Sequence, residues 1–329
     1  MKRQFRKLTI GRLVYLIYYK PLATVRRSIR EGGPINQLVT ESARQEMERT
    51  ARELEPVKAS QQPSSSFEVH MLTGARFWYQ SAFCVRSLVA HSTPEVIEPV
   101  FYDDGTLGDY QQQLHRIFPS ARFVSYDESK GRLDRYLPEA EFPYLRERWQ
   151  NYPNIRKLID PHIGSSGWKL VLDSDMLFFR RPNLVMEWLK NPTQPLYMLD
   201  TQESYGYSRE NLAELARAQL PRHLNVGLCA LRSDTICWKE IESWTEKLAA
   251  SGRTTYFLEQ ALIAMLLAEK TCTLAQVEDY IAYPALAEVL SPTAAMHHYV
   301  DTSKIHYFRH GWKTCLEIMF DQEQRAENA

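Results

Sequence analysis

The chain has 329 residues, 44% of them hydrophobic and 24% charged, and its 40 Lys and Arg balance its 40 Asp and Glu. This is ordinary globular composition, and the length suits one large α/β domain with an appendage or two modest domains. A formal net charge of zero is atypical of proteins that coat nucleic acid, because these need a basic excess, so we expect no nucleic-acid partner.

The cysteines and the apolar runs indicate in which cellular compartment the protein works. The chain has five cysteines, none of them in a CxxC pair, and such an odd set is not typical of a disulfide framework. We therefore expect a reducing, cytoplasmic setting. No apolar run approaches the roughly 20 residues of a membrane span, and the run at residues 13–19 lacks the cleavage site of a secretory signal.

Residues 1–58 predict a basic helical extension. The first 30 residues carry nine Lys or Arg and no acid, with apolar residues such as Phe5, Leu13 and Ile17 between them. Such a segment can lie on an anionic leaflet, which makes a peripheral contact with the inner face of a membrane one interpretation. The alternative is a helix packed on the domain with a solvated charged face. Residues 59–66 are polar and rich in Ser and Pro, and they predict a linker.

From residue 67 to residue 329 the sequence predicts one α/β domain. Short apolar runs at 67–72, 96–102, 121–125 and 168–172 predict strands, and they alternate with predicted helices at 76–91 and 107–118 and a helix-rich stretch to about 163. This alternation predicts a mostly parallel sheet with helices on both faces. Neither GxGxxG nor GxxxxGK[ST] follows the first strand, which disfavours ordinary dinucleotide-binding and P-loop enzymes.

Ligands of such sheets bind beyond the carboxyl ends of the strands. Those ends carry Thr73-Gly74, Asp103-Asp104 and the D-x-D motif Asp173-Ser174-Asp175. Two like charges beside a buried strand are unfavourable unless a cation neutralises them, and hard oxygen ligands suit Mn²⁺ or Mg²⁺. The motif therefore predicts a metal that bridges a diphosphate. The alternative is a solvated acidic turn.

Four further motifs follow in a set order along the chain. They are Arg156-Lys157 before the D-x-D strand, Asn225-Val226-Gly227 in an apolar run, Glu259-Gln260 before another apolar run, and His298-Tyr299 with Lys304 six residues after the histidine. The last three have structural alternatives: a strand bulge for Asn225-Val226-Gly227, a helix cap for Glu259, and exposed loop residues for the histidines. Asp103 and Asp104 before Gly105 could form a turn.

Together these motifs resemble the nucleotide-sugar glycosyltransferases of the GT-A fold, over about residues 67–313. The sequence is most similar to their retaining branch, represented by glycogenin and the lipooligosaccharide galactosyltransferases. The resemblance implies a Rossmann-like, mixed and mostly parallel sheet. It also implies a metal-dependent transfer of a sugar, most often from a UDP-sugar, to a hydroxyl of a glycan, lipid or other acceptor.

The resemblance also implies roles for individual residues. Asp173, Asp175 and His298 would hold Mn²⁺ or Mg²⁺, and His297, His306 and His310 compete for the third position. Lys304 and either Arg156 or Lys157 would contact phosphate. Asn225, Gly227 and Glu259 would contact the sugar, Gln260 would face the anomeric carbon, and Thr73, Gly74 and Asp103 are candidates for binding the rest of the donor. This sequence has Glu259 and Asp301 where the family has Asp and Gly.

Retention is implied by the resemblance, whereas an inverting mechanism would need a general base, for which Glu259 and Asp200 are candidates.

Two other functions use the same features. A nucleotidyltransferase would employ the two aspartates, although residues 72–76 are poor in the glycine that such enzymes display after their first strand. A catalytically degenerate module would bind a nucleotide sugar without turnover.

Overall fold

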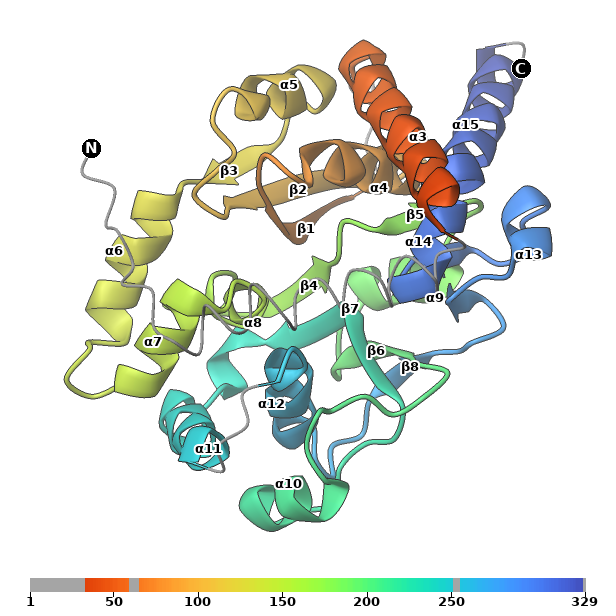
Figure 1. The fold of residues 1–329 in the computed structure, drawn as a ribbon. Coiled ribbons are helices and arrows are strands. Elements are labelled where there is room, and N and C mark those ends of the chain that lie inside the picture. Colours follow the sequence, from red (N-terminus) through yellow and green to blue (C-terminus); the bar gives the residue numbers. More distant parts are fainter. Residues whose placement is uncertain (1–32, 59–64, 251–254, 328–329) are drawn as a thin grey trace.

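The computed structural model describes residues 33–58, 65–250 and 255–327 (Figure 1). The basic segment at residues 1–32 and most of the predicted linker lie outside the described residues. No helix in the described part is both long and apolar enough to cross a membrane. All five cysteines lie in described segments and are free thiols.

The centre of the molecule is a mixed sheet of seven strands in the order β3-β2-β1-β4-β7-β6-β8. Its strands are β1 (Ser66–Thr73), β2 (Val96–Asp103), β3 (Arg122–Val124), β4 (Trp168–Leu172), β6 (Leu196–Leu199), β7 (Leu224–Arg232) and β8 (Thr273–Ala275). Only β7 runs antiparallel to both of its neighbours, while the other strand pairs in this sheet are parallel. The predicted mostly parallel sheet is therefore confirmed.

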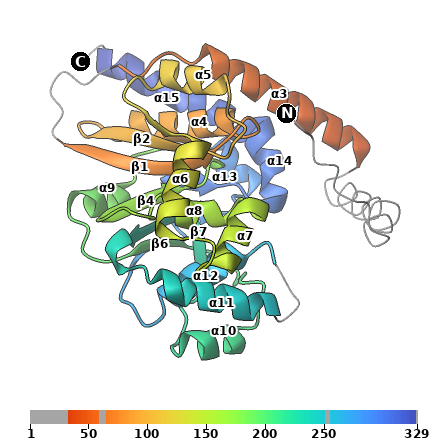
Figure 2. The ribbon, with the colours of Figure 1, turned by 90° about the vertical axis from the view of Figure 1, so that its left-hand side faces the viewer.

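Helices cover both faces of the sheet, as predicted (Figures 1 and 2). One apolar core includes residues of α3 (Pro34–Glu53), α4 (Trp78–Ala90), α5 (Tyr110–Ile117), α9 (Asn183–Lys190), α13 (Leu286–Leu290) and α15 (Trp312–Glu327). A second core includes residues of α6 (Tyr126–Tyr136), α7 (Pro143–Asn151), α8 (Ile155–Ile159), α10 (Arg209–Ala216), α11 (Trp238–Ala250) and α12 (Leu258–Leu266).

The central strand β7 shows how the sequence supplies both cores. Residues Leu228 and Ala230 belong to the first core, and Cys229 and Leu231 belong to the second. Successive side chains of a strand point to opposite faces, so a strand that is covered on both sides must be apolar almost throughout. Every residue of β7 except Arg232 is buried, which explains its continuous apolar run.

A small second sheet follows the D-x-D motif. It has the strand order β5-β10-β9, with β5 (Met176–Phe178), β9 (Tyr280–Ala282) and β10 (Met296–His298). In the β5–β10 register His298 lies opposite Met176, the residue that directly follows Asp175. The backbone N–H of Tyr299 donates a hydrogen bond to the carbonyl of Asp175 at 2.9 Å. This sheet therefore joins the D-x-D motif to the C-terminal part of the chain.

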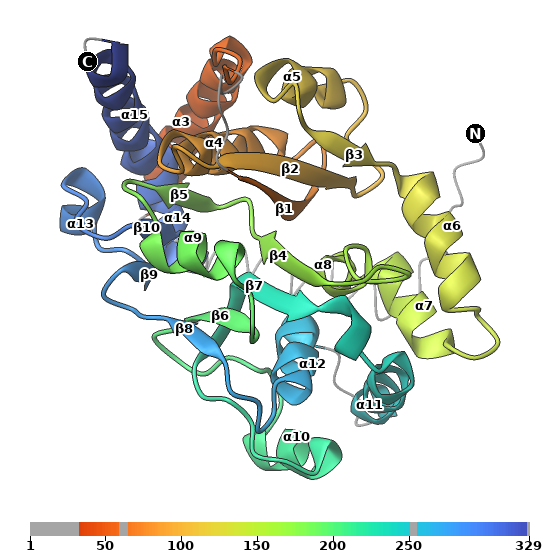
Figure 3. The same cartoon turned by 180° about the vertical axis from the view of Figure 1, so that it is seen from behind.

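Helix α3 belongs to the main core, although it precedes the predicted linker. Met47 and Ala51 of α3 are fully buried in the core that also contains α4 and α15. The Arg309 side chain donates hydrogen bonds to Thr40 and Asn36, and Lys313 pairs with Glu46. Figures 1 and 3 show α3 beside α15 from opposite sides. The predicted boundary at 59–66 thus separates two segments that share one core.

The C-terminal part of the chain forms one nearly continuous helical run. It begins at α14 (Lys304–His306), passes through a π-helical segment at Tyr307–Gly311 and continues as α15. Gly311 lies in this π-helical segment, where a Cβ atom would come within 2.6 Å of the Tyr299 hydroxyl. The segment therefore packs tightly against the residue that follows His298.

The packing of α3 predicts that it stabilises the whole domain. We expect Met47→Ala to lower the free energy of unfolding by about 2–5 kcal/mol, because it leaves a cavity in a close-packed core. The matched control Leu38→Ala, on the exposed side of the same helix, should change it by no more than about 0.5 kcal/mol. Chemical denaturation of the two variants measures both values, and equal small effects would contradict the shared core.

Candidate active site

A cleft of about 1800 Å³ lies at the edge where β4 ends and β7 begins. It is lined by Asp173 and Asp175 after β4, Asn225 and Gly227 on β7, Glu259 and Gln260 on α12, Lys157 on α8, His298 on β10 and Lys304 on α14. Because β7 is antiparallel to β4, its first residues meet the last residues of β4. The Asp173 N–H donates a hydrogen bond to the Gly227 carbonyl at 2.7 Å.

Asp173, Asp175 and His298 form one cluster in this cleft. One ligand atom from each of the three lies within 4.8 Å of the others. The His298 Nε2 atom is 3.3 Å from Asp175 Oδ1 and 3.7 Å from Asp173 Oδ2. The structure thus brings together the three residues that the sequence assigned to a metal.

The surroundings of His298 fit a metal ligand. Its ring is buried, its Nε2 atom faces the two carboxylates, and its Nδ1 atom has no hydrogen-bond partner within the described chain, which is rare for a buried polar group. The ring packs against Gly227, where a Cβ atom would come within 2.3 Å of His298 Cε1. Two carboxylates and an imidazole form a donor set suited to Mn²⁺, and carboxylates suit Mg²⁺. The residues present therefore fit a divalent ion.

Two lysines neutralise the aspartates in this structure. Lys304 Nζ lies 3.0 Å from Asp175 Oδ2, and Lys157 Nζ lies 2.6 Å from Asp173 Oδ1. Burial acts to raise the pKa of Asp175, but Lys304 and His298 outweigh it and hold that pKa below its ordinary value. The Asp175 carboxylate in turn raises the pKa of Lys304. The Asp175 carboxylate and the Lys304 ammonium group therefore remain ionised at neutral pH.

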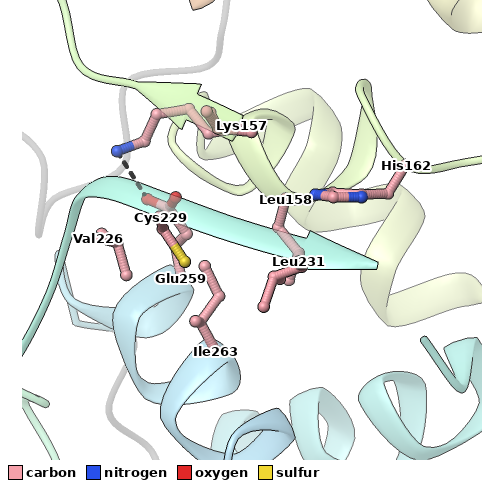
Figure 4. A pocket seen from close by; sticks show the side chains of 9 residues that line it. Lys157, Leu158, His162, Val226, Cys229, Leu231, Glu259 and Ile263 are labelled. Atoms are coloured by element: carbon pink, nitrogen blue, oxygen red, sulfur yellow. Dashed lines mark ion pairs between the residues drawn. The ribbon is translucent and has the colours of Figure 1, made fainter. Parts of the chain in front are cut away.

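Lys157 bridges Asp173 to Glu259, whose Oε2 atom is 3.1 Å from Nζ (Figure 4). Burial acts to lower the pKa of Lys157, but the two carboxylates raise it well above its ordinary value. Behind this pair is a cavity of about 10 Å³, lined also by His162, Cys229 and Ile263. Burial in these surroundings raises the pKa of Glu259 to about 7, although Lys157 opposes the rise. Glu259 is thus a carboxyl group that can change its charge near neutral pH.

A hydrogen-bonded network fixes the start of β7. The Asn225 Nδ2 group donates to Asp200 Oδ2 at 2.9 Å, and the Gly227 N–H donates to Asn225 Oδ1 at 2.8 Å. Gln260 Nε2 donates to the Leu224 carbonyl at 2.8 Å. The β6–β7 pairing also shifts register here, between Tyr197 and Met198. The N-x-G motif therefore lies at a strand irregularity, and its residues also line the cleft.

Four predicted donor-binding residues do not line this cleft. The Thr73 hydroxyl accepts a hydrogen bond from Ser81, and Gly74 lies against the Asp104 carboxylate, which a Cβ atom would meet at 2.1 Å. The Asp103 carboxylate accepts hydrogen bonds from the backbone N–H groups of residues 105–107. These contacts give all three residues a part in the turns after β1 and β2.

Arg156 is the fourth of these residues. Its guanidinium pairs with Asp160 at 2.8 Å and donates to the Asp103 carbonyl at 2.7 Å. It also stacks on Trp149, 4.6 Å from the ring centroid. Arg156 is therefore held inside the domain, and Lys157 is the member of the predicted pair that reaches the cleft.

The competing histidines also lie away from the cluster. Successive residues of a strand point to opposite faces, so His297 points away from His298 and its ring contacts Glu288 and Tyr299. His306 and His310 lie further along the C-terminal helical run and do not line the cleft.

Other lining residues were not predicted from the sequence. The aromatic lining residues are Phe77, Tyr79, Tyr256, Phe257, Tyr283 and Phe308, and α3 contributes Gln37, Thr40, Glu41 and Arg44. The α3 set has helical i, i+3, i+4 and i+7 spacing. That spacing is visible in the sequence, but it does not tell which surface the polar face would meet.

No family model and no curated protein matches the chain. The structure is similar to that of mouse xyloside xylosyltransferase 1 in its apo form, with a TM-score of 0.50 at 11% identity, over 71% of this chain and 97% of that chain. A galactosyltransferase LgtC complex with donor and acceptor sugar analogues gives 0.49 at 11% identity, over 77% of this chain and 95% of that chain.

The chain has the GT-A fold. This confirms the predicted fold class and, at the level of the fold, the resemblance drawn from the sequence motifs. In this GT-A domain the D-x-D aspartates follow β4, and the antiparallel strand β7 and the small sheet surround them.

The contact between Gly227 and His298 leads to a prediction about metal affinity. We expect Gly227→Ala to weaken Mn²⁺ binding at least about tenfold, because the added methyl group displaces the imidazole. Gly131→Ala is the matched control, since a Cβ atom there meets nothing within 4 Å. Titration calorimetry gives the two affinities and near-ultraviolet circular dichroism checks the fold. Unchanged Mn²⁺ affinity in a folded Gly227→Ala variant would contradict the assignment of His298.

Proposed function

We propose that the chain is a metal-dependent glycosyltransferase that moves a sugar from a nucleotide-diphosphate donor, a UDP-sugar, to a hydroxyl group of a carbohydrate or lipid-linked acceptor. The observation that carries this proposal is the Asp173, Asp175 and His298 cluster, in a cleft at the carboxyl end of β4 in a GT-A fold. The cleft volume of about 1800 Å³ exceeds the range of about 300–1000 Å³ for a pocket with one small ligand. Two substrates can therefore be accommodated together.

The three residues of the cluster would hold Mn²⁺ or Mg²⁺. A divalent ion supplies Lewis-acid neutralisation of the diphosphate that leaves the sugar. Lys304 adds a positive charge at the same place, and its side chain is 40% exposed, so it can turn from Asp175 toward a bound phosphate. Such preorganised charges stabilise a leaving group most effectively where water is excluded.

The residues at the start of β7 and α12 would bind the donor sugar. Asn225 and Gln260 line the cleft and are held by hydrogen bonds to Asp200 and the Leu224 carbonyl. Lys157 holds Glu259 beside them. We assign Gln260 to the face of the anomeric carbon and Asn225, Gly227 and Glu259 to the sugar. Thr73, Gly74 and Asp103 remain our candidates for the nucleoside side, where they would act through the turns that they form.

We propose transfer with retention of the anomeric configuration. Both candidates for the general base of an inverting mechanism are already engaged: Glu259 pairs with Lys157, and Asp200 accepts hydrogen bonds from Asn225 and the Thr201 N–H. This supports attack by the acceptor on the same side as the departing diphosphate.

We also propose that the protein works in the cytoplasm, at the inner face of a membrane. The support is the composition of residues 1–30, which carry nine cationic side chains and no acid. Such a segment is attracted to anionic headgroups.

The metal cluster predicts the effect of removing its ligands. With a panel of UDP-sugars, we expect UDP release that requires Mn²⁺ or Mg²⁺, stops with a chelator and returns when the ion is restored. Asp173→Ala, Asp175→Ala and His298→Ala should each lower kcat/KM by on the order of 10³-fold, since a bound ion contributes several kcal/mol of charge stabilisation. His306→Ala is the matched control and should retain activity. A larger loss in His306→Ala than in His298→Ala would reassign the third ligand.

Retention is tested separately on the product. We expect the new glycosidic bond to have the same anomeric configuration as the donor, as read from proton coupling constants in a nuclear magnetic resonance spectrum of the early product. Inversion would rule out our mechanism while leaving the transferase proposal in place. It would also direct attention to Asp200 and Glu259, whose substitution by amides separates their roles as a base.

A further inference from the structure

Helix α3 has an apolar ridge on its outer surface. The ridge consists of Ile35, Leu38 and Val39, with exposed fractions of 78%, 72% and 48%. Their i, i+3 and i+4 spacing puts the three side chains on one face of the helix. Three large apolar side chains exposed within five residues form a contiguous patch, which marks an interaction site more often than single exposed residues do.

The opposite face of the same helix lines the cleft through Gln37, Thr40, Glu41 and Arg44. Each residue of an α-helix rotates the chain by 100° about the helix axis, so the mean direction of these four side chains lies about half a turn from that of the ridge. The ridge therefore points away from the cleft, and the two are separated by about one helix diameter, roughly 10 Å.

Helix α3 is held on the domain by several contacts. Arg309 donates hydrogen bonds to Thr40 and Asn36, Glu46 forms an ion pair with Lys313, and Met47 is fully buried. A ligand that holds the ridge would therefore orient the whole domain.

The chain leading into the ridge indicates what would bind it. Residues 1–30 carry nine Lys or Arg without an acid, and Phe5, Leu8, Leu13 and Leu16 lie among them. A protein partner would have to match both the cationic and the apolar side chains. An anionic lipid leaflet offers both at every point, because its headgroups attract cations and its acyl boundary accepts apolar side chains.

We propose that α3 docks the protein on an anionic lipid leaflet by inserting Ile35, Leu38 and Val39, while its opposite face forms a wall of the cleft. Docking in this way holds the cleft about one helix diameter from the headgroups. The acceptor is then a lipid-linked molecule whose polar part reaches the cleft around the edge of α3. Only this last statement rests on the proposed transferase function.

The test is sedimentation of the full chain with vesicles of phosphatidylcholine, with and without phosphatidylglycerol. We expect the wild-type protein to bind the anionic vesicles. The variant with Ile35→Ser, Leu38→Ser and Val39→Ser together should partition at least about tenfold more weakly, because it no longer buries the apolar ridge. The matched control carries Tyr136→Ser and Tyr144→Ser, which remove exposed aromatic side chains from α6 and α7, at the far side of the molecule from α3 (Figure 1).

The outcomes separate this proposal from the proposed function. Equal partition of the triple variant and the wild type overturns the docking proposal. The docking proposal is also overturned if the triple variant differs from the wild type in its mass in solution or in its Tm. Such a difference would mean that a second copy or residues 1–32 cover the ridge. Donor hydrolysis without vesicles should be the same in wild type and triple variant. If the wild type hydrolyses no donor but the partition falls as expected, docking stands and the transferase proposal fails.

Discussion

The arrangement of the candidate site depends on how the negative charges of the carboxylates after β4 are neutralised. In the described part of the chain, Asp173, Asp175 and Glu259 form ion pairs with two lysines, Lys157 and Lys304. With all three acids ionised, the cluster keeps one negative charge, which would repel a diphosphate. A divalent ion would reverse that sign, so the same residues would then attract the diphosphate of the proposed donor. The excess of acid thus supports the proposal that this site binds a metal.

The surrounding fold explains why these groups meet. Parallel strands alone would put the ends of β4 and β7 at the same edge, but antiparallel β7 brings its beginning there, with Asn225 and Gly227. The small sheet then sets His298 beside Met176. Glycine at 227 leaves the space that the imidazole fills. The cluster therefore requires a reversed strand with a missing side chain, both supplied by β7, and a strand register supplied by the small sheet.

The sequence could predict the parts of this site that are local. The alternation of strands and helices led to the fold, and two acids after an apolar strand led to the D-x-D cluster. Physical argument from the sequence could not choose between adjacent residues, because His297 and His298 differ only in the strand face on which they lie, and the register with β5 selects that face. In the same way, Arg156 and Lys157 differ only by one helical step, yet one lies on Trp149 and the other in the cleft. Such choices depend on long-range packing.

Helix α3 is the clearest case of information absent from local pattern. A polar, charged sequence before a linker suggested an appendage, whereas Met47 and Ala51 make it part of the core. Few apolar residues suffice because α3 buries only a narrow stripe, and Arg309 and Lys313 hold its polar flank. The helix cannot leave without exposing that stripe and opening the cleft. Under the docking proposal, a wall fixed in this way would couple the orientation of the domain on a lipid surface to the position of its cleft, although α3 lies outside the family resemblance.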